Sequence, residues 1–214
     1  MRATARAVVG PRVPAHELRR RPLRYWLPTL LLGAAAACLV ASIFLPYWKL
    51  TLHAPQYPKG LHVHAYLDRM TGDVAEIDAL NHYIGMRRLD EAARLERSLS
   101  IIAVSVIALL VAAAVFIHTR FAAYLSLPAA LFPAAFLVDL QLWLRHFGTH
   151  LDPRAPLSQA IKPFVPPVLG QGFVGQFSTV ARVEAGFHLA LAATAAIAVG
   201  LYFHWRAYRP LAER

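Results

Sequence analysis

Four long apolar segments alternate with more polar ones along the chain. They cover residues 27–47, 99–118, 121–144 and 186–204. Each is close to the roughly 20 apolar residues that a helix needs to cross the hydrocarbon core of a bilayer. Trp26 and Trp48 flank the first segment and Trp205 follows the last, as aromatic side chains do at a membrane interface. The pattern predicts four transmembrane helices.

The stretch between the first two segments, residues 48–98, has a different pattern. "WKLTLHA" and "LHVHAYLD" alternate apolar and polar positions and flank "PQYPKG", whose prolines and glycine are typical of a connecting loop, so a β-hairpin is predicted. "TGDVAEIDALNHYIG" has apolar residues at helical spacing, and Gly85 is placed to end that helix. "MRRLDEAARLERS" predicts a second amphipathic helix that runs into the next apolar segment. A small α+β domain is therefore expected here.

The stretch between the last two segments, residues 145–185, is rich in proline and glycine. This composition favours a long loop without regular elements, and its many apolar side chains indicate that it is ordered over the outer domain or forms a partner surface. The expected fold class is a mainly α membrane protein, with four transmembrane helices, a small α+β outer (periplasmic) domain and a long Pro/Gly-rich outer loop.

Basic residues predict the orientation in the membrane. The leader, residues 1–26, the tail, residues 205–214, and Arg120 between the second and third segments carry many arginines but only two acids, Glu17 and Glu213. Because lysine and arginine are enriched on the cytoplasmic side, both termini are expected to be cytoplasmic, with the two longer polar stretches outside. Four arginines at the outer end of the second segment oppose this orientation: Arg87, Arg88, Arg94 and Arg97.

The first segment also has features of a cleaved signal peptide, because a basic leader precedes the small residues "GAAAAC". Its apolar run continues to "IFLPYW", so an uncleaved signal anchor is the preferred interpretation. Cys38 lies in this run. A cysteine packed among small residues inside the helix is preferred to the alternative, the lipid-accepting cysteine of a lipoprotein. As the single cysteine, Cys38 excludes an internal disulfide framework.

The composition agrees with a membrane protein. Of the 214 residues, 57% are hydrophobic and 16% are charged, which is too apolar for an ordinary soluble domain. The net charge of +10 fits the predicted topology. Since the basic residues lack interleaved aromatics and a groove-reading motif, no nucleic-acid partner is expected. The chain has no nucleotide loop, nucleophile elbow or cysteine metal motif, so an enzyme is not expected.

The histidines of the predicted hairpin are candidate metal ligands. One register that matches the apolar faces of the two strands places His53 opposite His62, with His64 one pleat along the same face. Three imidazoles within reach of one ion suit copper or zinc. The alternative is that these side chains lie on a solvated strand face and bind nothing.

His82 and Met86 form a second candidate pair in "LNHYIGM". Imidazole and thioether together favour copper. However, Gly85 is expected to end the helix before Met86, which disrupts the helical spacing that would bring the two side chains together. The alternative roles are interaction of His82 with the free carbonyls of the helix end and packing of Met86.

A third candidate group surrounds the outer ends of the third and fourth apolar segments. Asp139 lies inside an apolar window, where a carboxylate is costly and usually faces the bundle, a cavity or a partner. His146 and, if the helix continues past Gly148, His150 share its face, and His188 is at a similar depth in the fourth segment. The alternatives are an ion pair of Asp139 with Arg145 and histidines at the membrane interface.

Several of these segments resemble the signature blocks of a known family. "APQYPKGL", "LNHYIGM", "LDPRAPL" and "PFVPPVLG" are similar to blocks of an uncharacterised family of bacterial multi-pass membrane proteins, associated with the gene neighbourhoods of copper enzymes such as nitrous oxide reductase and its accessory proteins. The similarity covers residues 48–186. It implies the bacterial inner membrane as location and a role as accessory protein or subunit of a copper enzyme.

The leading interpretation is a non-enzymatic protein in the lipid bilayer whose outer domain binds copper or docks on a copper-dependent enzyme or its accessory proteins. One alternative is a purely structural subunit of a membrane oxidoreductase or monooxygenase complex. A small transporter is a weaker alternative, since few polar residues, such as Asp139, Ser105 and Ser126, lie inside the apolar segments.

Overall fold

The computed structural model describes residues 9–10, 13–174 and 177–212. The chain divides into two compact units that each combine distant parts of the sequence. Unit 1 contains Met1–Ser42, Ile102–Pro133 and Leu189–Arg214, and unit 2 contains Ile43–Ile101 and Ala134–His188.

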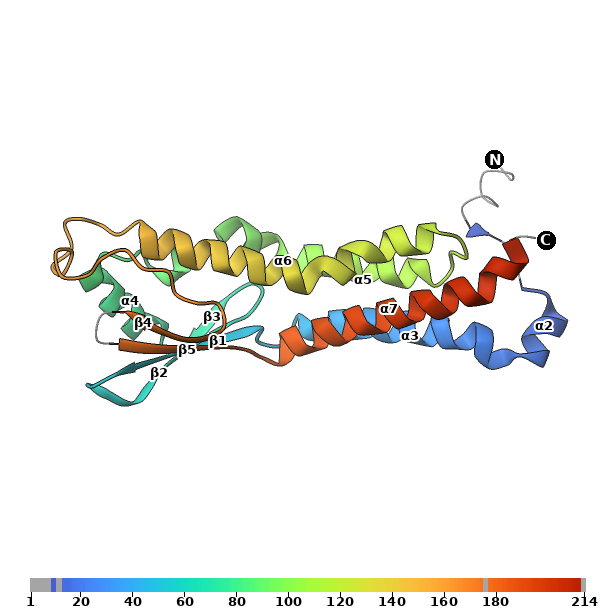
Figure 1. The fold of residues 1–214 in the computed structure, drawn as a ribbon, viewed down its shortest axis with the longest axis horizontal. Helices are drawn as coiled ribbons and strands as arrows, with labels where there is room; N and C mark the ends of the chain where they lie inside the picture. The colour runs from blue at the N-terminus through green and yellow to red at the C-terminus, as the bar shows by residue number, and fades with distance from the viewer. Residues whose placement is uncertain (1–8, 11–12, 175–176, 213–214) are drawn as a thin grey trace. The chain divides into compact units, whose positions relative to one another are not determined.

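Four helices are long and apolar enough to cross a membrane, which confirms the helical prediction for all four apolar segments. They are α3 (Pro22–Ser42), α5 (Arg94–Ala114), α6 (Phe121–Thr149) and α7 (Ala185–Ala212) (Figure 1). The helices α6 and α7 extend beyond the apolar windows, and α5 begins before its window, because polar residues continue the backbone hydrogen bonding of a helix. A short helix, α2 (Ala15–Arg20), precedes α3.

Small side chains dominate the core of unit 1. Ala35, Ala108, Ala122 and Ala193 are completely or almost completely buried there, together with larger side chains such as Leu32. Small residues let helices approach closely, which favours association where lipid rather than water surrounds them. The core is therefore of the kind expected for a bundle of membrane helices.

The start of α3 and the end of α7 lie together in unit 1. Arg24 Nη2 donates a hydrogen bond to the carbonyl oxygen of Arg206 at 2.8 Å, and the rings of Tyr25 and Tyr208 are 5.7 Å apart. The ring of His118, from the turn between α5 and α6, stacks on Tyr208 at 4.0 Å. The described ends of the chain thus share one end of this unit, as an even number of antiparallel spans requires.

A five-stranded antiparallel sheet forms the centre of unit 2. Its strands are β1 (Trp48–Ala54), β2 (Tyr57–Ala65), β3 (Met70–Gly72), β4 (Gly170–Val174) and β5 (Phe177–Val183), in the order β3-β2-β1-β5-β4. The predicted hairpin is confirmed as β1–β2. The prediction of a loop without regular elements over residues 145–185 is wrong for β4 and β5. These strands form because β1 offers its second edge to β5, a pairing between distant segments.

The inner face of the sheet is apolar and covered by helices. Leu52, Leu61 and Val63 pack with Ile77 of α4 (Val74–Ile84), whereas Trp48, Ala65 and Ala181 pack against side chains of α6: Phe136, Leu140 and Leu144. The alternation of apolar and polar residues along the strands places all of these sheet residues on one side. This face holds the core of unit 2.

Residues 150–169, between α6 and β4, are ordered over the rest of unit 2, as their apolar side chains predict. The amide of Leu157 donates to the carbonyl oxygen of Tyr83 at 3.0 Å, at the end of α4. On α6, the Gln141 side chain bonds both the carbonyl oxygen of Pro166, at 3.2 Å, and the amide of Val168, at 3.0 Å. These bonds hold the segment onto the two helices.

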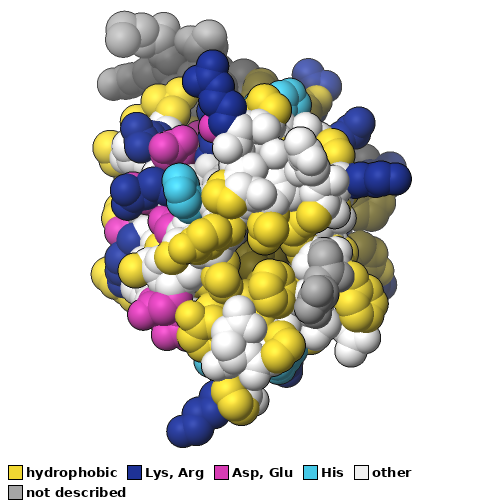
Figure 2. Space-filling view, turned by 90° about the vertical axis from the view of Figure 1, so that its left-hand side faces the viewer, with side chains coloured by type: hydrophobic (Ala, Val, Ile, Leu, Met, Phe, Trp, Pro, Cys, Tyr) yellow, Lys and Arg dark blue, Asp and Glu magenta, His cyan; other side chains and the backbone are white. Residues whose placement is uncertain are grey.

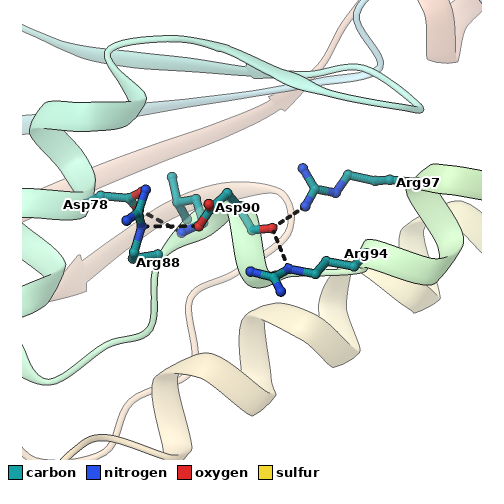
Figure 3. A network of polar contacts seen from close by, with 6 residues as sticks. Asp78, Arg88, Asp90, Arg94 and Arg97 are labelled. Carbon is teal, nitrogen blue, oxygen red and sulfur yellow. Dashed lines mark hydrogen bonds and ion pairs between the residues drawn. The ribbon is translucent and has the colours of Figure 1, made fainter.

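The connection between α4 and α5 differs from the continuous amphipathic helix that was predicted. It contains a short 3-10 helix, η1 (Leu89–Glu91), and Ala93 has φ 49°, which interrupts the helical path before α5. Arg88 Nε lies 3.7 Å from Asp78 Oδ2 and 3.3 Å from Asp90 Oδ1 (Figure 3). Arg88, one of the four arginines that oppose the predicted orientation in the membrane, thus pairs with two acids of unit 2.

Candidate functional site

The hairpin histidines lie on the face of the sheet opposite the core, but in a different register from the predicted one. Thr51, not His53, is opposite His62, and Lys49 is opposite His64. The reason is the turn: β2 already begins at Tyr57, so most of "PQYPKG" belongs to the strand instead of the connecting loop. His53 is displaced toward the tip of the hairpin and pairs with Ser178 of β5.

Two of the hairpin imidazoles have partners within the protein. His62 Nδ1 is 3.1 Å from Thr51 Oγ1, and His64 Nδ1 donates a hydrogen bond to Glu184 Oε2 at 2.8 Å. His53 is exposed beside Gly60. Across residues 9–10, 13–174 and 177–212, no group of three or more histidine, cysteine, aspartate or glutamate side chains is placed to hold a metal ion. The predicted three-histidine centre is therefore not assembled in this conformation.

His82 and Met86 have different surroundings. Helix α4 ends at Gly85, which has φ 79°, and the amide of Met86 returns to the carbonyl oxygen of Asn81 at 2.9 Å. This pattern confirms the predicted helix end and corresponds to a Schellman motif. His82 is exposed beside Tyr83, whereas Met86 lines an apolar cavity below the sheet. The structure does not bring them together as a ligand pair.

The third candidate group is also dispersed, except for two neighbouring histidines. Helix α6 continues through Gly148, so the rings of His146 and His150 come within 4.3 Å, and His150 Nδ1 donates to the carbonyl oxygen of His146 at 3.0 Å. Asp139 is half-buried, and within the described residues it forms no ion pair with Arg145. His188 is exposed, and its Nδ1 donates to the carbonyl oxygen of Glu184 at 2.8 Å.

A polar groove crosses the outer face of the sheet where β1, β2 and β5 meet. Its volume is about 540 Å³, and its lining includes Lys49, His64, Tyr66, Arg182 and Glu184. Lys49 and Arg182 are direct register partners on β1 and β5, so their side chains project from the same face. The groove therefore combines two fixed positive charges with one carboxylate, which His64 already engages.

Neither cation of this groove has an acidic partner in the described part of the chain. The N-terminus of α7, which begins at Ala185 on the groove wall, adds the positive end of a helix dipole. Like charges on directly opposed positions of two strands destabilise a sheet. The groove is thus suited to an anionic group supplied from outside the described chain.

The sequence pattern alone did not indicate the groove. Lys49 and Arg182 are far apart along the chain, and only the pairing of β1 with β5 brings them together. The alternation of apolar and polar residues in "FSTVARV" is a signal for β5, but it does not show which strand of the sheet β5 pairs with. The partner of His64, Glu184, depends on the same pairing.

Comparison with known proteins gives no assignment: no family model, no curated protein and no solved structure matches the chain. The chemistry of unit 2 is therefore inferred from the groove and the histidines themselves.

Proposed function

We propose that the protein is a membrane-anchored accessory protein, and not an enzyme, whose unit 2 docks through the outer face of its sheet on an acidic surface of a partner protein. The observation that carries this proposal is the opposed pair Lys49 and Arg182 on neighbouring strands. An acidic partner supplies the counter-charges that the described residues lack, so binding relieves the repulsion between the two cations.

A copper-dependent enzyme or one of its accessory proteins is the partner class that this proposal names. The support for it is the resemblance of "APQYPKGL", "LNHYIGM" and "PFVPPVLG" to a family associated with such enzymes. Four helices long and apolar enough to span a bilayer supply the anchor. Binding of copper by the chain itself is a separate part of the proposal and rests on the same resemblance, since the histidines do not form a three-ligand centre.

The docking proposal is tested by charge reversal on the sheet. Lys49→Glu with Arg182→Glu reverses both cations of the groove, whereas Arg154→Glu with Lys162→Glu makes the same change of net charge on the segment after α6. Each tagged protein is captured from native membranes at increasing salt concentration, and the bound proteins are identified by mass spectrometry with metal analysis.

We expect the parent protein and the Arg154/Lys162 variant to retain a copper enzyme or its accessory protein. The Lys49/Arg182 variant should retain about tenfold less, and salt should weaken capture by the parent, because opposite charges attract the partner. Capture of equal amounts of the partner by both variants would contradict docking through the outer face of the sheet. A partner set without copper proteins would favour the alternative of a structural subunit of a membrane oxidoreductase or monooxygenase.

Copper binding by the chain is tested in the same samples after a wash with chelator. Loss of stoichiometric copper in the His62→Ala, His64→Ala variant, but not in the His146→Ala, His150→Ala variant, would assign the metal to the sheet. The reverse result would assign it to the end of α6. A parent protein without copper would leave docking as its only proposed role.

A further inference from the structure

The inner face of the sheet borders an apolar cavity of about 100 Å³. Its walls come from the sheet, α4, the α4–α5 connection, the unit 2 part of α6 and residues 164–166, all within unit 2. Aliphatic side chains predominate in the lining, and aromatic and sulfur-containing side chains complete it: Trp48, Met70, Met86, Trp143, Phe147, Phe164 and Phe177. Hydrophobic side chains surround a hollow on the face drawn in Figure 2.

The cavity wall is held in place by polar contacts outside it. Leu89 lines the cavity, and its amide donates to Asp78 Oδ1 at 2.7 Å. The carbonyl oxygen of Asp90 accepts a bond from Arg94 Nε at 3.3 Å and a second from Arg97 (Figure 3). This network fixes the α4–α5 connection. The cavity is thus preformed, as pockets for small apolar ligands generally are.

One polar group of the cavity has no partner. Asn81, the second residue of "LNHYIGM", is 7% exposed and lines the cavity, and its Nδ2 makes no hydrogen bond within the described chain. The Schellman turn of Met86 and Gly85 fixes the backbone of Asn81 at the end of α4. A buried donor without a partner is costly, and native structures rarely retain one without a reason.

A water molecule is a poor partner for this amide. Buried water typically makes about three hydrogen bonds, whereas the described lining is almost entirely apolar. Besides Asn81 it offers the hydroxyl of Thr179 and the indole N–H of Trp143, since Trp48 Nε1 already donates to the carbonyl oxygen of Val168. Apolar cavities stay dry and accept apolar ligands: one of roughly 150 Å³ binds benzene. The present cavity therefore suits a short hydrocarbon segment that carries a hydrogen-bond acceptor.

We propose that this cavity binds the carbonyl-bearing segment of a lipid acyl ester, with Asn81 Nδ2 donating a hydrogen bond to the ester carbonyl oxygen. The hydrocarbon next to the carbonyl fills the space between the sheet and α6, and the rest of the lipid lies outside. An acyl ester is uncharged, as the lack of lysine and arginine among the described lining residues requires. It is also abundant around a protein whose four long helices are apolar enough for a bilayer.

Two tryptophans of the cavity wall, Trp48 and Trp143, provide the readout. Trp26 and Trp205, which do not line the cavity, are replaced by phenylalanine in every sample. The full chain is placed in nanodiscs of ether-linked phospholipids, which contain no ester carbonyl. Fluorescence quenching is then titrated with the methyl ester of 10-bromodecanoic acid and with 1-bromodecane, a probe without the carbonyl.

We expect the ester to quench at a concentration about 3- to 10-fold lower than the alkane, the difference made by one hydrogen bond. Asn81→Leu should abolish this preference while leaving quenching by the alkane intact. His82→Leu changes an exposed position on the same helix and should preserve the preference. Equal potency of the two probes in the parent, or an unchanged preference in Asn81→Leu, would overturn the proposal.

Filling the cavity tests whether the probes bind inside it. Ala65→Leu fills the cavity and should weaken quenching by both probes, whereas undiminished quenching would place the probes elsewhere and overturn the proposal. A thermal midpoint equal to or above that of the parent shows that Asn81→Leu is folded. The same titration in nanodiscs of ester-linked lipids identifies the source of the ligand. If these lipids weaken quenching by the added ester, the ligand is a bilayer lipid, and if they do not, it is a free ester.

Discussion

Gly85 combines two requirements that no other residue type meets at its position. Its φ is 79°, and a Cβ atom added there would lie 2.6 Å from the carbonyl oxygen of Asp152. The amide of Asp152 in turn donates to the carbonyl oxygen of Gly85 at 2.8 Å. The glycine therefore ends α4 and also lets the segment after α6 lie directly against that helix end.

Gly85→Ala should destabilise the protein by about 2–4 kcal/mol, from left-handed strain plus the collision with Asp152. Gly170→Ala is the matched control, because Gly170 has φ 88° and open space around its Cβ position. It should cost about 1–2 kcal/mol from strain alone. Denaturant unfolding of both variants, monitored by tryptophan fluorescence, measures the difference. Equal losses would show that Asp152 moves away at no cost.

Asp78 is one of the acids that hold the α4–α5 connection in place. Asp78→Ala removes the acceptor of the Leu89 amide and should cost about 1–3 kcal/mol of unfolding free energy. Asp78→Asn keeps an acceptor oxygen and should cost less than about 1 kcal/mol, since the lost ion pair involves the exposed Arg88. The same unfolding measurement compares them. A loss in Asp78→Asn as large as in Asp78→Ala would instead assign the stability to the ion pair.

Prediction from sequence succeeded at the residue scale where the signal was local. Gly85 follows an apolar helical pattern directly, so its role was readable from a few residues. The histidines were placed on the correct strands, but their partners, Thr51 and Glu184, depend on the register and on a distant strand. The role that we propose for Asn81 had no signal in sequence, because it depends on the apolar lining of the cavity and on an Nδ2 without a partner in the described chain.

At the scale of elements, β1 is the strand on which the sheet is organised. It pairs with β2 on one edge and β5 on the other, and its Lys49 meets His64 and Arg182 in the same row. Arg182→Glu should therefore turn a repulsive cross-strand pair into an attractive one. The expected gain is about 0.2–1 kcal/mol, at the low end because Arg182 is exposed.

The measurement is a double-mutant cycle of unfolding free energies with Lys49→Glu, Arg182→Glu and both together. The double variant restores like charges and should lose the gain. A cycle with no coupling between the two positions would show that their side chains diverge in solution. The single substitution Arg182→Glu should thus stabilise the sheet but weaken the proposed docking on an acidic partner.

The elements themselves could be predicted as far as their patterns are local. The hairpin alternates cleanly over two neighbouring strands, and its existence was predicted correctly, but the turn was placed too wide. The strands β4 and β5 were missed because glycines and prolines around them obscure the alternation. Their stability comes from pairing with β1, a tertiary effect that overrides local propensity.

At the scale of the molecule, the four apolar helices were the strongest signal, since their length and hydropathy are set by the bilayer. The sides of the membrane remain a prediction, which single cysteines can test in a Cys38→Ser background. Cysteines at Lys59 and Lys162 should react with an impermeant maleimide in right-side-out vesicles. Cysteines at Arg19 and Arg120 should react only in inside-out vesicles. Labelling of either pair on both sides, or of all four together, would contradict the predicted topology.

The place of β1 between two partners also constrains how the chain is made. β2 follows β1 within a few residues, but β5 leaves the ribosome only after the whole of α5 and α6. Until then one edge of β1 has free amide and carbonyl groups, which are open to pairing with other chains. Such distant strand pairing is slow. Unit 2 therefore completes its sheet only after three of the four apolar helices have been synthesised, and a chain arrested before β5 exposes an edge prone to aggregation.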